Sequence, residues 1–164
     1  MTGATDLFEV RMLGTPLVLR ERSRQQGADL LREMALIRTG GASGGRQAHS
    51  PIRLLELAHE LDTAYGPYVA TNNSEMDAAL DRGEDTLDEV VYQLPTAAVT
   101  FIEHVRDILI EVEQYCRSDT YLLILEPAPE IAAYRNWSME QVLTQYRGEP
   151  PTSWPDYAAA RGLG

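Results

Sequence analysis

Apolar residues recur with helical spacing between Pro95 and Cys116, the stretch with the strongest pattern in the chain. One row has spacings of four, three, four and three residues and consists of Phe101, Val105, Ile108, Val112 and Tyr115. A second row beside it consists of Val99, Ile102, Leu109 and Cys116. Two adjacent apolar rows are too wide for a helix that contacts a single neighbour. The pattern therefore predicts a central helix over residues 95–116 that is buried on most sides.

Two proline-containing signals predict long helices before this stretch. In each of the pairs Thr15-Pro16 and Ser50-Pro51, a residue that caps helices precedes a proline, and proline favours the first helical position. The first pair predicts a helix over residues 15–38, which is polar in its first half and apolar in its second half. The second pair predicts a helix over residues 50–65, with apolar residues on one face.

Glycine and proline residues predict where the remaining helices lie. Gly66-Pro67 should stop the second helix, and Ser74 should cap a separate short helix over residues 75–82. A last long helix is expected over residues 129–147, because Gly148 follows it and prolines come soon after.

Four long helices joined by mainly polar connections predict an all-α fold. The expected architecture is a bundle of four to five helices around the central helix. Residues 1–14 would then be an N-terminal arm, residues 15–148 the helical bundle domain, and residues 149–164 a C-terminal tail rich in proline and aromatic residues.

The alternative is an α+β fold with a small sheet. Residues 7–13 alternate loosely between apolar and polar positions, and residues 121–125 are a fully apolar run. Residues 86–94 fit either a helical turn or a strand, with residues 89–93 as the strand. Hydrophobic period does not separate the two structures in segments this short.

The composition excludes several classes of function. The chain has 164 residues and a net charge of −11, and all 14 of its basic residues are arginine. An acidic chain does not suit nucleic acids, whose phosphates need a cationic surface. The lack of lysine in the sequence removes both the P-loop lysine and the Schiff-base lysine.

The sequence also predicts a cytoplasmic protein. No apolar run reaches the roughly 18 residues that a membrane span needs, so no membrane contact is expected. The N-terminal residues are acidic and do not have the basic and apolar regions of a secretory signal. Cys116 is the one cysteine of the chain, which fits a reducing compartment.

No motif in the sequence points to a catalytic centre. The chain lacks the G-x-S-x-G pattern, paired cysteines and the Rossmann glycine pattern. The glycine-rich residues 39–50 contain no GK[ST] sequence, so a phosphate loop is not expected there. We therefore expect no cofactor, and a non-enzymatic role is favoured.

The strongest metal-binding candidate is the pair Glu56 and His59. Residues three apart share one helix face, so a carboxylate and an imidazole could hold one ion. Di-iron bundles use two such Glu-x-x-His motifs, and this chain has one. Glu103, His104 and Asp107 are the candidate ligands on the central helix. The commoner explanation for both groups is a solvated helix face.

Acidic residues gather before residue 90. They are Glu75, Asp77, Asp81, Glu84, Asp85, Asp88 and Glu89. Their order does not fit a calcium loop. The simple interpretation is a surface that keeps the protein soluble. The sharper hypothesis is a docking patch, with Asp81, Glu84 and Asp85 as its members, for an arginine-rich protein partner.

Aromatic residues are concentrated in the last long helix and the tail. Tyr134, Trp137, Tyr146 and Trp154 are the candidates for an exposed interaction patch, because tyrosine and tryptophan are enriched at the centres of interfaces. The competing interpretation is that most of them are anchors of the core or of the tail.

Two stretches resemble a family of small helical proteins from actinobacteria. They are LGTPLVLRERSRQQGADLLREMALI, residues 13–37, and AYRNWSMEQVLTQYRGEPPTSW, residues 133–154. Arginine in place of lysine also suits a GC-rich bacterial genome. The resemblance implies an association with anti-sigma ATPases and STAS-domain antagonists of partner-switching pathways. It implies no catalytic residue.

These observations lead to three hypotheses about function. The leading one is a regulatory protein that acts in bacterial signal transduction through contacts with another protein that has a basic surface. The second is a ligand- or metal-binding helical bundle, with an enzymatic role as one option. The third is a homo-oligomer assembled through the helix of residues 15–38 or that of residues 129–147.

Overall fold

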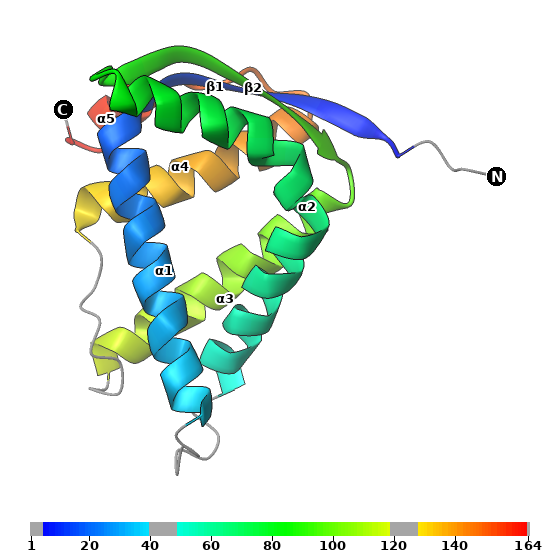
Figure 1. Ribbon diagram of the computed structural model, residues 1–164, viewed down its shortest axis with the longest axis vertical. Coiled ribbons are helices and arrows are strands. Elements are labelled where there is room, and N and C mark those ends of the chain that lie inside the picture. Colours follow the sequence, from blue (N-terminus) through cyan, green and yellow to red (C-terminus); the bar gives the residue numbers. More distant parts are fainter. Residues whose placement is uncertain (1–4, 40–48, 119–127, 164) are drawn as a thin grey trace.

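The computed structural model describes residues 5–39, 49–118 and 128–163. The elements in chain order are β1 (Leu7–Pro16), α1 (Leu17–Thr39), α2 (His49–Asp81), β2 (Thr86–Pro95), α3 (Ala98–Ser118), α4 (Pro129–Tyr146) and α5 (Trp154–Ala160). Figure 1 shows the two strands running together across one end of the helices. The fold is therefore α+β, and the prediction of an all-α bundle is wrong.

The small sheet confirms the alternative prediction for two of its three segments. β1 and β2 pair in antiparallel order, from Leu7 opposite Pro95 to Pro16 opposite Thr86. The third segment, residues 121–125, lies outside the described residues. The all-α prediction failed because neither strand has strong local signals, and each becomes regular only when it pairs with a segment distant in sequence.

Alternation along both strands gives the sheet one buried and one exposed face. The residues that point into the core include Val10, Met12, Val90 and Leu94, which are all buried. The residues that point outward include Glu9, Arg11, Glu89 and Gln93, which are all exposed. This arrangement is the usual one for an antiparallel sheet that packs on helices with a single face.

Thr15 and Pro16 end β1 and do not start α1, contrary to the helix start predicted from this pair. Thr15 is buried opposite Leu87. The backbone N–H of Leu17 then donates a hydrogen bond of 2.9 Å to the carbonyl oxygen of Asp85. The strand continues to the proline because a partner strand is present, and a proline at a strand end interrupts the ladder least.

α2 continues through Gly66 and Pro67, although the sequence predicts that the helix stops there. The separate helix expected over residues 75–82 is the last part of α2. Figure 1 shows that α2 changes direction along its length, so that its second part runs beneath the sheet. Proline removes one backbone hydrogen bond and bends a helix. Packing against the sheet and α3 compensates for this loss.

The core lies between the inner face of the sheet, the second part of α2 and α4. Val10, Leu17, Ala79 and Trp137 of this core are fully buried, and Met76 is almost fully buried. α4 matches the helix predicted over residues 129–147 closely. The core therefore lies between one face of the sheet and the helices that cover that face.

α3 exists as predicted, but it is not the central helix of the structure. Only Ala98 and Val99 are buried among its residues 98–110, and Ile110 is 49% exposed. α3 contacts α2 and α4, and no strand or helix covers the side of Ile110 within the described part of the chain. A wide apolar stripe therefore did not mark the centre of the fold here.

The C-terminal tail packs against the end of β1 through α5. The indole N–H of Trp137 donates a hydrogen bond of 2.9 Å to the carbonyl oxygen of Thr152. Ser153 caps α5 by accepting a hydrogen bond of 3.3 Å from the N–H of Asp156. The bond from Trp137 joins the tail to α4.

Among the helices of residues 5–39, 49–118 and 128–163, none has both the length and the apolar character needed to cross a bilayer.

Candidate functional site

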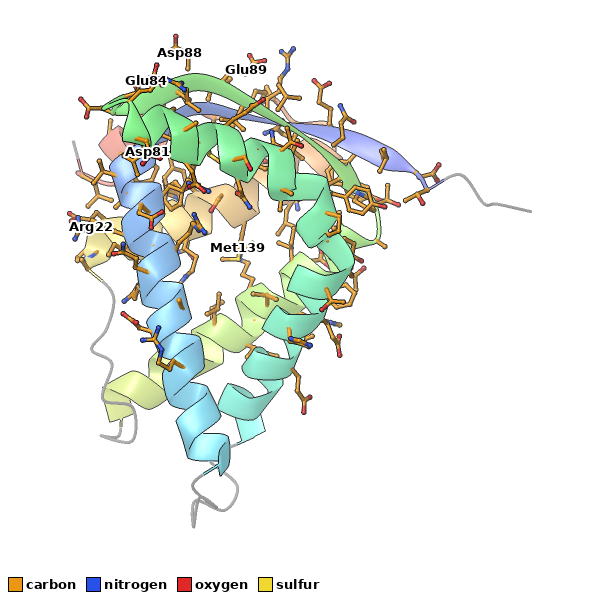
Figure 2. The ribbon with its side chains drawn as sticks, viewed as in Figure 1. Arg22, Asp81, Glu84, Asp88, Glu89 and Met139 are labelled. Atoms are coloured by element: carbon orange, nitrogen blue, oxygen red, sulfur yellow. The ribbon has the colours of Figure 1, made fainter. Side chains whose placement is uncertain are left out.

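Five exposed carboxylates form a strip where α2 passes into β2. This acidic strip consists of Asp81, Glu84, Asp85, Asp88 and Glu89. Figure 2 shows that the labelled members lie at the same end of the sheet. The structure thus brings the predicted docking residues Asp81, Glu84 and Asp85 together and extends them along the start of β2.

Hydrogen bonds hold the backbone of the turn between α2 and β2, at the middle of the acidic strip. Gly83 has a φ of +82°, which glycine adopts without the strain that other residues incur. Its backbone N–H donates a hydrogen bond of 2.9 Å to the carbonyl oxygen of Leu80, and the N–H of Glu84 donates one of 3.0 Å to the carbonyl oxygen of Ala79. This pair of bonds is the Schellman motif that ends many helices. The carbonyl of Asp85 is fixed in turn by the N–H of Leu17 at 2.9 Å.

The charge of the acidic strip is only partly neutralised. Arg82 pairs with Glu84 at 2.9 Å, and Arg11 lies 3.9 Å from Glu89. Both ion pairs are exposed and are therefore weak. Within residues 5–39, 49–118 and 128–163, no ion pair involves Asp81, Asp85 or Asp88. The acidic strip has a net negative charge available to a partner.

The aromatic residues of α4 and the tail divide into two groups. Tyr134 and Trp137 are buried in the core, and Trp154 is half-buried against both. The ring centroids of these three residues lie 5.7 to 5.9 Å apart. Tyr134 and Trp137 therefore anchor the core and cannot form an exposed patch. Tyr146 is the candidate that is 48% exposed, with its ring against that of Phe8 at 5.1 Å.

The candidate metal ligands lie on the surfaces of two neighbouring helices. Glu56 and His59 of α2 are exposed, and so are Glu103, His104 and Asp107 of α3. In the part of the chain that the structure describes, no three histidine, cysteine, aspartate or glutamate side chains are grouped to hold a metal ion. The geometry gives the metal hypothesis no support.

An apolar cavity that the sequence did not predict lies beneath the inner face of the sheet. Its volume is about 360 Å³, and it is partly open to solvent. The sheet contributes Met12, Tyr92 and Leu94 to its walls. The helices contribute Tyr65, Gly66 and Val69 from α2, Ala98 and Ile102 from α3, and Tyr134, Ser138 and Val142 from α4. Small residues on three helices thus leave space that larger side chains would fill.

A buried arginine interacts electrostatically with Tyr92 and Tyr134 of this cavity. Arg20 is 4% exposed, and its guanidinium donates hydrogen bonds to Asp77 at 2.8 Å and to Asn73 at 3.1 Å. The bond from Arg20 lowers the pKa of the Asp77 carboxyl below its usual value. Asp77, which Arg24 also contacts at 3.1 Å, thereby supplies the opposite charge that a buried arginine requires.

Tyr92 and Tyr134 of the cavity are uncharged. Burial raises the pKa of each above the usual value for a phenol, and this effect exceeds the opposing effect of Arg20. Both hydroxyls therefore keep their protons at neutral pH and can donate hydrogen bonds. No signal in the sequence brings Tyr92 and Tyr134 together, because they lie on a strand and a helix far apart in the chain.

Comparison of the chain with protein-family models, with curated proteins and with solved structures gives no match.

Proposed function

We propose that this chain is a cytoplasmic, non-enzymatic regulatory protein that binds another protein through the acidic strip. The partner presents a basic surface, and the setting is bacterial signal transduction of the partner-switching type. The single observation that carries the proposal is a group of five exposed carboxylates, Asp81, Glu84, Asp85, Asp88 and Glu89, on and beside the hydrogen-bonded turn between α2 and β2.

The hydrogen-bonded turn favours binding for a physical reason. A partner that meets a preorganised surface does not have to order it, so less of the interaction energy is lost on association. The carboxylates also attract a basic protein before contact and raise the rate of association. Arg11 and Arg82 pair with two of the five carboxylates, those of Glu89 and Glu84, and the other three have no ion pair within the described residues.

A charge-neutralising variant tests the proposal. Asp81, Asp85 and Asp88 are changed together to asparagine, which removes three charges with little change in shape. The matched control changes Glu60→Gln, Glu103→Gln and Asp107→Asn, which are exposed positions on α2 and α3. The wild-type protein, immobilised, is used to capture partners from an actinobacterial extract, and each captured protein is then purified for titration.

We expect to capture a protein with a basic surface. Its affinity for the asparagine variant should be at least ten-fold lower than for the wild type, and its affinity for the control variant should be unchanged. The affinity should also fall as salt is raised from about 0.1 M to 1 M, because the screening length falls from about 10 Å to about 3 Å. Equal loss in both variants, or capture that salt does not affect, would argue against the acidic strip as the binding surface.

A further inference from the structure

We propose that the cavity beneath the sheet binds a neutral, mainly apolar small molecule that carries a hydrogen-bond acceptor. The inference is independent of the acidic strip, because none of the five carboxylates of the strip lines the cavity. Volume, wall chemistry and two hydroxyl groups each support it.

The volume of the cavity matches that of sites that bind small molecules. This cavity measures about 360 Å³, which lies within the range of about 300–1,000 Å³ of small-molecule sites. An apolar cavity of about 150 Å³ accommodates benzene, so this one has room for a molecule with two fused rings.

The wall chemistry selects a neutral ligand. Apolar side chains such as Met12, Leu94, Ile102 and Val142 form most of the surface, and no charged residue lines the cavity within the described residues. The nearby guanidinium of Arg20 is already bound to Asp77 and Asn73. A carboxylate or phosphate would therefore enter without a cationic partner, at a large desolvation cost.

Two phenols supply the polar contact. Neither the Tyr92 nor the Tyr134 hydroxyl forms a hydrogen bond within residues 5–39, 49–118 and 128–163. Both residues line the cavity and keep their protons. A carbonyl or ether oxygen on the ligand would accept a hydrogen bond from one of them. Ser138 does not compete for this role, because its hydroxyl already donates to the carbonyl oxygens of its own helix.

The test uses the dye 6-propionyl-2-(dimethylamino)naphthalene, a neutral two-ring ketone whose emission shifts to the blue in apolar surroundings. Titration of the full chain should give a saturable blue shift with one dye per protein. The anionic dye 8-anilinonaphthalene-1-sulfonate should not displace it. The variant with Asp81, Asp85 and Asp88 changed to asparagine should bind the neutral dye as the wild type does, which separates this inference from the proposed function.

Variants that fill the cavity identify the site. Ser138→Leu should weaken binding of the neutral dye at least ten-fold, whereas Asn136→Leu, at an exposed position of the same helix, should leave it unchanged. Ile102→Phe and its control Ile110→Phe repeat the comparison on α3, so the test survives if one variant does not fold. Tyr92→Phe or Tyr134→Phe should weaken binding roughly 2- to 12-fold, as expected for one neutral hydrogen bond.

Three results would overturn the inference. The first is an emission spectrum unchanged by the folded protein. The second is equal binding of the neutral dye by wild type, Ser138→Leu and Ile102→Phe, each shown to be folded by circular dichroism. The third is displacement by the anionic dye at comparable concentration, since the walls would then tolerate a charge.

Discussion

The side-chain amide of Gln145 completes the hydrogen bonding of the Arg11 backbone. Its Oε1 accepts a bond of 2.8 Å from the N–H of Arg11, and its Nε2 donates a bond of 2.8 Å to the carbonyl oxygen of the same residue. One side chain of α4 thus occupies the place of a third strand at the outer edge of β1. Such a contact both fastens the sheet to α4 and covers an edge that would otherwise be open to pairing.

Gln145→Ala should destabilise the protein by about 1–2 kcal/mol. The variant loses two hydrogen bonds to the Arg11 backbone, each worth about 0.5–1.5 kcal/mol. Because the site is exposed, water can bind the freed backbone groups and reduce the loss of stability. The free energy of unfolding from chemical denaturation measures the effect. Asn136→Ala, on the exposed side of α4, is the control and should be neutral within about 0.5 kcal/mol. A neutral Gln145→Ala would mean that the edge contact adds nothing to stability.

Gly14→Ala and Gly27→Ala should change stability in opposite directions. Gly14 has a φ of +67°, and a β-carbon there would lie 2.9 Å from Cδ of Pro155. Both the backbone conformation and the contact oppose a side chain, so we expect a loss of about 1–3 kcal/mol. A β-carbon at Gly27 of α1 meets nothing within 4 Å, and alanine should stabilise this helix by about 0.5–1 kcal/mol. Thermal unfolding of the two variants checks both signs.

The ion pair of Asp77 with Arg20 should make stability depend on acid pH. The pKa of Asp77 is lowered in the folded protein, mainly by the hydrogen bond from Arg20. A depressed folded-state pKa contributes stability above the unfolded value of about 3.9, and this contribution is lost as the pH falls through the folded value.

Asp77→Asn should therefore be less stable than wild type by a constant amount between about pH 7 and pH 5, and the difference should shrink below about pH 3.9. Denaturation curves of the two proteins across this range give the measurement. Asp88→Asn, at an exposed position of β2 without an ion pair in the described residues, serves as the control. A difference that does not vary with pH would show that the Asp77 carboxylate is not stabilised by its partners.

Trp137→Ala should cost roughly 3–5 kcal/mol, the usual range for removal of a buried aromatic side chain. Trp137 is fully buried, contacts Tyr134 and Trp154, and holds the tail through Thr152. Tyr146→Ala, at the exposed end of α4, should cost less because half of its ring is already in water. The comparison by chemical denaturation distinguishes an anchor of the core from a surface aromatic residue, and equal losses would contradict this assignment.

The sequence by itself determined the structures that depend on neighbouring residues. The limits of α4 follow from Pro129 and from Gly148, and the predicted helix over residues 129–147 agrees with the structure to one residue. The two strands were visible as an alternative, because residues 7–13 alternate and residues 89–93 contain β-branched residues and a tyrosine. Signals of this kind act over a few residues and need no distant partner.

Only the tertiary structure decided the elements whose local signals compete with distant contacts. Thr15 and Pro16 have the order of a helix start, yet pairing with β2 places them in a strand. Gly66-Pro67 has the order of a helix stop, yet α2 passes through it.

The cavity walls likewise come from two paired strands and three helices. Of the predicted aromatic patch, Tyr134 and Trp137 are buried in the core, which leaves the exposed Tyr146 and the half-buried Trp154. The physical reason is that burial of apolar surface is summed over contacts between segments far apart in sequence. These contacts outweigh the local preference of about 1 kcal/mol or less that most single residues express.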